Sequence, residues 1–304
     1  MRPAAIAIAL SCLFLASCGG SSDDSTSEAG PGDGRTLEEL WRAPGDDVAV
    51  VPGTANHEPG EVRMSFLVVD AESRPVVIPT ARVWVAGALE QEPFLESTAK
   101  LERIGVPGGA EADATHIYVA HLQLPDPGTY WLLAEPEGGR EVQALGNVIV
   151  AEADSVPSVG EAVPESDTPT LASVGGNASA ITTRTPPDES LLRYSVADSL
   201  RAGVPFVVTF STPKFCQSRT CGPVVDVVEE VARRFEDTDV RFIHVEVFQG
   251  NDPARGYNRW MREWGLETEP WTFLVGRDGR VVERYEGVVS VLELEEAVNT
   301  VLGR

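Results

Sequence analysis

Basic side chains are scarce in this chain of 304 residues. Its 24 lysines and arginines face 47 aspartates and glutamates, which gives a formal net charge of -23. Lysine itself occurs only as Lys100 and Lys214. Such an acidic surface repels a polyphosphate, so the sequence predicts no nucleic-acid partner. The acidity otherwise favours solubility and identifies no ligand.

Long apolar runs are equally rare. The stretch from Ala4 to Ala16 is broken only by Ser11 and Cys12 and is too short for a membrane-spanning helix. It follows Arg2, and a short apolar run behind a positive residue is typical of a signal peptide. No later run reaches about 18 residues, so we expect the rest of the chain to be soluble.

The apolar run ends in Leu15-Ala16-Ser17-Cys18-Gly19, which resembles the bacterial lipobox. This resemblance implies that residues 1–17 are removed as a signal peptide and that Cys18 is acylated. The protein would then be anchored to the membrane on its extracytoplasmic face. An ordinary secretory signal in which Cys18 is incidental remains an alternative, and export is expected in both cases.

Cysteine is the next scarce residue, with four in the chain. Cys12 is expected to leave with the signal peptide, and Cys18 would be blocked by lipid. Cys216 and Cys221 therefore form the one pair that is available for redox chemistry, in a compartment that permits disulfides.

Composition divides the remaining chain. Residues 18–46 hold the lipidated cysteine and a tether rich in Gly, Ser, Asp and Pro, which we expect to be disordered, with a transient helix from Thr36 to Trp41. Residues 47–153 lack cysteine and contain short strand-like runs separated by Gly and Pro turns, which predicts an antiparallel β-sandwich. The expected strands are 62–69, 81–85, 116–122, 129–133 and 147–150.

The segment Leu124-Pro125-Asp126-Pro127-Gly128-Thr129-Tyr130 resembles the PGxY corner of exported immunoglobulin-like domains. That resemblance implies an immunoglobulin-like sandwich. Nothing in this domain indicates catalysis, so we interpret it as a spacer or partner-docking module. Trp84 and Trp131 are expected in its core.

Residues 154–187 are expected to be a linker, because Pro, Ser, Thr, Gly and Ala dominate without periodicity. From residue 188 to 304 helical and strand patterns alternate, which predicts a mixed sheet with helices on both faces. The expected helices are 191–201, 224–235, 253–264 and 291–302, and the expected strands are 204–210, 240–248, 271–275 and 280–285.

The order of these elements resembles the thioredoxin fold, and the motifs agree with it. Val207 to Ser211 resembles the strand before the active site, and Cys221-Gly222-Pro223 with the helix after it resembles the second active-site cysteine. Glu269-Pro270-Trp271 resembles the start of the strand with the family's cis-proline, and Gly276 to Val281 its final hairpin. The resemblance covers residues 188–304 and implies a membrane-anchored thiol-disulfide oxidoreductase.

In such a site Cys216 would attack, Cys221 would resolve, and Pro270 would present its backbone to substrate. A thiol must be a thiolate to attack a disulfide, and a helix N-terminus favours that anion. The implied partners are thiols and disulfides of other proteins in the cell envelope. The sequence predicts no cofactor and no resident metal.

The sequence departs from the family at several positions. Four residues separate Cys216 from Cys221, where thioredoxins have two. Thr209 stands where the family often has a buried Asp, and His244 where it often has a Lys. We expect His244 to handle protons for Cys221, or else to be a core histidine with a backbone partner. Glu269 would oppose thiolate formation unless it points into solvent.

Other interpretations of the cysteine pair remain. It could be a structural disulfide in a binding or assembly lipoprotein. The four-residue spacing also resembles Q-type peroxiredoxins, although Pro213 stands where their loop has Thr or Ser. Copper delivery is a further alternative, for which the ligands are few: beyond His244 the histidines lie in the β-domain, as His57, His116 and His121.

Overall fold

The computed structural model describes residues 33–43, 46–55, 57–106, 115–137, 142–152, 155–215 and 224–304. The expected signal peptide, Cys18 and most of the tether lie outside the described residues, and so do Cys216 and Cys221. In the described ranges, no helix is long and apolar enough to cross a membrane.

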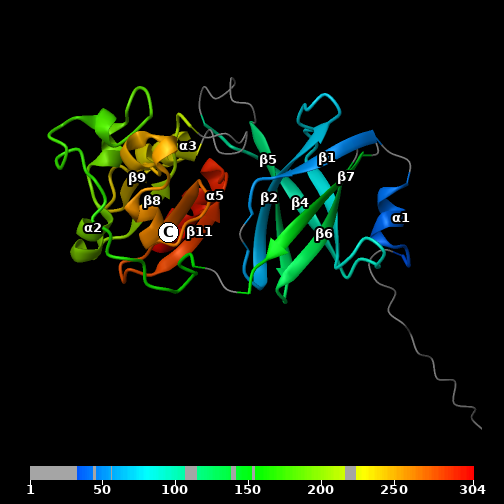
Figure 1. Ribbon diagram of the computed structural model, residues 1–304. Coiled ribbons are helices and arrows are strands. Elements are labelled where there is room, and N and C mark those ends of the chain that lie inside the picture. Colours follow the sequence, from blue (N-terminus) through cyan, green and yellow to red (C-terminus); the bar gives the residue numbers. More distant parts are fainter. Residues whose placement is uncertain are drawn as a thin grey trace, which may run out of the picture.

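The chain is mostly β-sheet with a few helices, arranged as two packed units (Figure 1). The first unit, here called the barrel, is a sheet that closes on itself in the order β1-β2-β5-β4-β3-β6-β7. Side chains that alternate along the strands point inward and fill its interior, where the rings of Phe66 and Tyr118 stack with their centroids 5.5 Å apart. Its strands are β1 (Asp46–Pro52), β2 (Gly60–Asp70), β3 (Thr80–Ala86), β4 (Leu95–Arg103), β5 (His116–Leu124), β6 (Gly128–Pro136) and β7 (Val142–Val150).

The closed sheet corrects the expected sandwich of two separate sheets. β4 pairs with both β3 and β5, so the β3–β4 hairpin joins the two halves at one seam. At the other seam β1 runs parallel to β7, whereas the other strand pairs of the barrel are antiparallel. Near the start of β6, the Tyr130 hydroxyl donates to the carbonyl of Asp126, which precedes the strand, at 2.7 Å; this is the bond of a tyrosine corner.

The helix α1 (Leu37–Trp41) corrects the expected disorder of the tether's end. Thr36 and Glu39 form a capping box at its N-terminus. Leu37 and Leu40 are buried against Trp84 and Leu133 on the outer face of the barrel, away from the second unit (Figure 1). This apolar docking makes the short helix a stable part of the barrel rather than a transient one.

The second unit, here called the α/β part, comprises residues 155–304 of the described chain. Its sheet has the order β11-β10-β8-β9, with β8 parallel to β9 and the other neighbours antiparallel. The strands are β8 (Phe206–Phe210), β9 (Arg241–Val245), β10 (Trp271–Val275) and β11 (Val281–Glu286). The helices are α2 (Val196–Ala202), α3 (Val224–Arg234), α4 (Arg259–Glu263) and α5 (Val291–Leu302), with short 3-10 helices η2 (Ala178–Ala180), η3 (Glu189–Leu192), η4 (Gln249–Asn251) and η5 (Pro253–Arg255).

Helices cover both faces of this sheet, as the sequence pattern predicts. α3 and α5 pack on the face of Val207 and Leu274, while α2 and α4 pack on the face of Val208 and Phe273. Two expected helices are shorter than predicted because caps interrupt them. Ser195 caps α2 and separates it from η3, and Asn258 caps α4 after the break at Gly256.

The expected linker packs against the α/β part along its length. Among the described residues it contains only the short helix η2, in agreement with its lack of periodicity. Ser166 nevertheless binds Glu263 and the indole of Trp264, and Ala162 forms a β-bridge with Arg280. Residues 155–187 thus belong to the packed unit, although they carry few apolar side chains.

The barrel and the α/β part share an apolar core. Leu67, Ile117 and Val119 of β2 and β5 join the cluster that contains α3 and α5. Polar contacts reinforce this boundary, where the Val291 N–H donates to the Ile104 carbonyl at 2.9 Å. α5 and β11 therefore lie against the outer face of β2 and β5 (Figure 1).

Candidate functional site

Pro270 lies at the edge of the sheet where β8 ends and β10 begins. The Glu269–Pro270 peptide bond is cis, as the thioredoxin resemblance implies. Trp271 pairs with Phe210, so Pro270 is placed beside Ser211, the first residue after β8. Pro270 is buried, Glu269 is half-buried, and the Pro270 carbonyl accepts from the Gly287 N–H at 2.9 Å.

The segment with both cysteines runs between Phe215 and Val224, which are described. Phe215 packs edge-to-face on Phe248, with ring centroids 6.4 Å apart, and the Lys214 N–H donates to Thr183. Val224 is buried and begins α3. The predicted roles of Cys216, Cys221 and Pro270 stay predictions, because the two cysteines lie outside the described residues.

Thr209 occupies the position where the thioredoxin family often has a carboxylate. It is fully buried and paired with Thr272 of β10, and the two hydroxyl oxygens lie 3.0 Å apart. Each threonine thus satisfies the other, and neither changes protonation near neutral pH. This position supplies no proton acceptor for a thiol.

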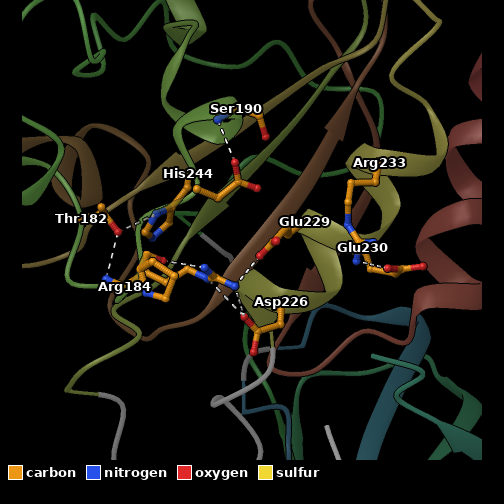
Figure 2. A network of polar contacts seen from close by, with 10 residues as sticks. Thr182, Arg184, Ser190, Asp226, Glu229, Glu230, Arg233 and His244 are labelled. Atoms are coloured by element: carbon orange, nitrogen blue, oxygen red, sulfur yellow. Dashed lines mark hydrogen bonds and ion pairs between the residues drawn. The ribbon is translucent and has the colours of Figure 1, made fainter. Parts of the chain in front are cut away.

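His244 lies on β9, where it is paired with Thr209 of β8. Both of its ring nitrogens have partners. Its Nε2 lies 3.0 Å from the Ser211 carbonyl, which can only accept, so Nε2 carries the proton. Its Nδ1 lies 3.3 Å from the Thr182 hydroxyl, which itself accepts from the Arg184 N–H (Figure 2).

The surroundings of His244 keep it neutral. Burial lowers its pKa to about 4, and the positive charge of Arg184 acts in the same direction against the bond to Ser211. This geometry is that of the core histidine with a backbone partner. Proton transfer to Cys221 by His244 stays a prediction, and it would require the bond to Ser211 to break.

Arg184 ties the segment before η3 to the start of α3, a relationship that sequence reasoning missed. Its guanidinium contacts Asp226 at 2.9 Å and also Glu229, both on α3, and donates to the Pro186 carbonyl at 2.7 Å (Figure 2). Arg184 stands in a stretch with a linker's composition, so no pattern indicates its partner. The contact fixes the N-terminal half of α3, the helix that follows Cys221.

Glu246 follows β9 and is a second buried ionisable group at this edge. Its carboxylate accepts from the Thr183 N–H and hydroxyl at 3.2 and 3.0 Å, and burial raises its pKa. Its Oε2 lies 3.9 Å from Nε2 of His244. Because His244 is neutral near neutral pH, this approach is not an ion pair there.

The described residues include no group of three His, Cys, Asp or Glu side chains placed to hold a metal ion. His116 and His121 pair with different residues of the barrel sheet, Arg103 and Arg63. His57 lies apart from both, between the barrel and the α/β part.

Comparison with known proteins yields little beyond this geometry. No family model matches the sequence, and no curated protein matches it. Among solved structures, the chain is similar to a thiol:disulfide interchange protein of the thioredoxin family from Chlorobium tepidum TLS. The two share 18% identity over 34% of this chain and 83% of that chain, with a TM-score of 0.29.

Proposed function

We propose that residues 188–304 form a thioredoxin-like domain that exchanges thiols and disulfides through Cys216 and Cys221. The supporting observation is the register of β10 against β8. It places cis-Pro270 beside Ser211, at the start of the segment that carries both cysteines to the first residue of α3. This is the order of strand, cysteine pair, helix and cis-proline that the thioredoxin resemblance implies.

In the proposed reaction the Cys216 thiolate attacks a disulfide of a partner protein. A mixed disulfide forms, and one partner sulfur leaves as a thiolate. Cys221 then attacks the Cys216 sulfur, which releases the reduced partner and leaves Cys216 and Cys221 joined. A thiol reductant of the cell envelope must reduce this disulfide again, with two electrons for each turnover.

Trapping tests the exchange reaction. In cells, Cys221→Ser should accumulate mixed disulfides on Cys216 that disappear on reduction, because the resolving thiol is missing. Cys216→Ser is the matched control and should trap far less. Purified wild-type protein should reduce insulin disulfides in the presence of a thiol reductant. The absence of both trapped partners and reductase activity would contradict the proposal.

We further propose that the protein is a lipoprotein anchored through Cys18 on the extracytoplasmic face of the membrane. The support is the signal-peptide pattern that ends in Leu15-Ala16-Ser17-Cys18. Cells grown with labelled palmitate should incorporate the label into wild-type protein and into Cys216→Ser, but not into Cys18→Ser. Labelling that survives in Cys18→Ser would exclude this anchor.

A second candidate is a binding or assembly lipoprotein in which the disulfide only braces a loop. The hydrogen bonds at Thr209, Thr272 and His244 favour this second candidate. Thr209 and Thr272 bond to each other, and His244 is neutral and bonded to Ser211, so none of the three is free to accept a proton from a thiol. A structural disulfide should have a reduction potential below about -300 mV. A potential near those of thioredoxins, at about -270 mV or higher, would favour exchange.

Copper delivery and peroxidase activity remain minor alternatives. Both ring nitrogens of His244 are engaged, so the ring must turn before it can bind a metal. Copper titration of the reduced protein, with Cys216→Ser as the control, tests the first alternative, and peroxide consumption tests the second.

A further inference from the structure

A cleft of about 750 Å³ lies between the barrel and the α/β part. Residues of β2 and β5 line one side, and residues of β11 and α5 line the other. The cleft extends to Trp271, the residue after Pro270. Its volume lies in the range of small-molecule sites, which occur preferentially at domain boundaries.

The charge of this cleft is strongly negative. Six glutamates line it, against two arginines, and each arginine already has a carboxylate partner. Arg63 pairs with Glu293 at 2.7 Å, and Arg284 pairs with Glu58 at 3.0 Å. The remaining lining carboxylates are Glu61, Glu283, Glu286 and Glu296.

Two of these carboxylates, Glu283 and Glu296, form no ion pair with any Lys, Arg or His of the described chain. Glu283 is exposed at the surface of the cleft, but partial desolvation there and the nearby charges of Glu61 and Glu293 raise its pKa, although His121 and Arg63 oppose the shift. The ionised form of Glu283 is thus disfavoured by its surroundings. A positive group in the cleft would relieve that repulsion.

His57 gives an independent indication of a ligand. His57 lines the cleft and is only 6% exposed. Among the described residues, its imidazole ring has no hydrogen-bond or ion-pair partner. Burial lowers its pKa to about 4, with a further contribution from the Arg284 charge. The imidazole is therefore neutral near neutral pH and presents one nitrogen that can accept a hydrogen bond.

We propose that this cleft binds an alkylammonium group. An ammonium group donates hydrogen bonds and accepts none, so it matches both the neutral imidazole of His57 and the carboxylates of Glu283 and Glu296. A free polyamine and a lysine side chain of an extended peptide share this chemistry. The proposal does not depend on the thiol reaction, since neither cysteine takes part in it.

Titration calorimetry of the full mature chain at low salt tests the proposal with two probes, spermidine and N-acetyl-lysine amide. N-acetyl-norleucine amide, which lacks the ammonium group, is the control ligand. We expect at least one of the two charged probes to bind and norleucine amide not to bind. Tighter binding of spermidine would identify a polyamine site, and tighter binding of the lysine derivative a peptide site.

Variants then locate the binding. Glu283→Gln with Glu296→Gln should weaken it about tenfold or more, and His57→Phe should weaken it without changing net charge at neutral pH. Glu236→Gln, an exposed glutamate of the α/β part outside the cleft, makes a matched change and should have little effect. Both Gln positions are exposed, so this variant remains informative if His57→Phe fails to fold. No binding of either charged probe, or equal weakening by Glu236→Gln, would overturn the proposal.

Discussion

Arg63 of β2 donates two hydrogen bonds to the carboxylate of Glu293 of α5, from Nε at 2.7 Å and from Nη2 at 2.9 Å. Both side chains are largely buried, with 13% and 15% of their surface exposed. The same Nη2 donates to the Val288 carbonyl at 3.1 Å, and the guanidinium lies over the Tyr285 ring. One side chain of the barrel thus contacts three places on the α/β part.

Removing this guanidinium should weaken the whole boundary. Arg63→Met leaves the buried Glu293 carboxylate without its partner, and we expect a loss of about 3 kcal/mol in the free energy of unfolding. Arg82→Met is the matched control, because Arg82 pairs with Glu96 and Glu137 at the surface and is 47% exposed. It should cost less than about 1 kcal/mol. Urea unfolding compares them, and equal losses would contradict the role assigned to Arg63.

Gly287 should tolerate no side chain. Its φ is +71°, and a Cβ there would lie 1.8 Å from the Gly53 carbonyl oxygen of the barrel. Gly303 has nearly the same φ of +69° but has nothing within 4 Å of a Cβ. Gly303→Ala should therefore cost only the backbone strain, about 1 kcal/mol, whereas Gly287→Ala should cost clearly more. Thermal unfolding of the two variants measures the difference. Similar melting temperatures would mean that the backbone at Gly53 can shift at little cost to accommodate the added Cβ.

The free energy of unfolding should decrease as the pH is lowered below about 6.5, the ordinary pKa of histidine. Because the folded-state pKa of His244 is lowered to about 4, the unfolded chain binds its proton first as the pH falls through about 6.5. Stability from this group is fully present above that pH and is lost progressively down to pH 4. The loss should approach about 3 kcal/mol for His244.

Urea unfolding at several pH values checks this slope. His244→Gln, which can keep a donor to Ser211 and an acceptor for Thr182, should reduce the fall between pH 6.5 and 4 and leave the part that His57 contributes through its own lowered pKa. His116→Gln, a histidine outside the core, is the matched control. An unchanged slope in His244→Gln would show that other groups cause the acid sensitivity.

The tyrosine corner should stabilise the barrel by a single hydrogen bond. Tyr130→Phe removes the donor to the Asp126 carbonyl, and we expect a cost of about 1 kcal/mol. Tyr194→Phe removes the hydroxyl of a more exposed tyrosine, one that stacks with Arg241, and should cost almost nothing. Chemical denaturation of both variants compares the two values.

The sequence predicts the strongly patterned elements well. α5 begins at Val291 and ends at Leu302, as the helical period and the Ser290 capping box dictate. β10 likewise has the expected bounds. In each of these elements the apolar pattern and the local caps agree with the packing, so no tertiary information is needed.

The missed elements lack such a pattern. β4 reads Leu-Glu-Ser-Thr-Ala-Lys-Leu-Glu-Arg, so most of its residues are polar; it fully buries only Ala99, while Leu95 and Leu101 pack partly buried against the barrel core. β1 begins with two aspartates and gains its place by pairing with β2 and β7. Long-range backbone pairing decides both strands, and it also closes the barrel.

The candidate site divides in the same way. Pro270 and the ends of β8 and α3 follow from motifs that keep their order along the chain. The contacts of Arg184, Thr183 and Glu246 join residues about 40 to 60 positions apart, across a stretch that looks like a linker. No local signal could show them, because they depend on how that stretch wraps around the sheet.

The apolar cluster that crosses from β2 and β5 to α3 and α5 has a consequence for how this protein can be divided. Leu67, Ile117 and Val119 of the barrel, and the α3 and α5 side chains that they contact, would meet water if the chain were cut between the two units. The barrel and the α/β part should therefore melt in one cooperative transition, and neither should fold stably when it is expressed without the other. We therefore expect a ligand that binds and stabilises one unit to raise the melting temperature of the other as well.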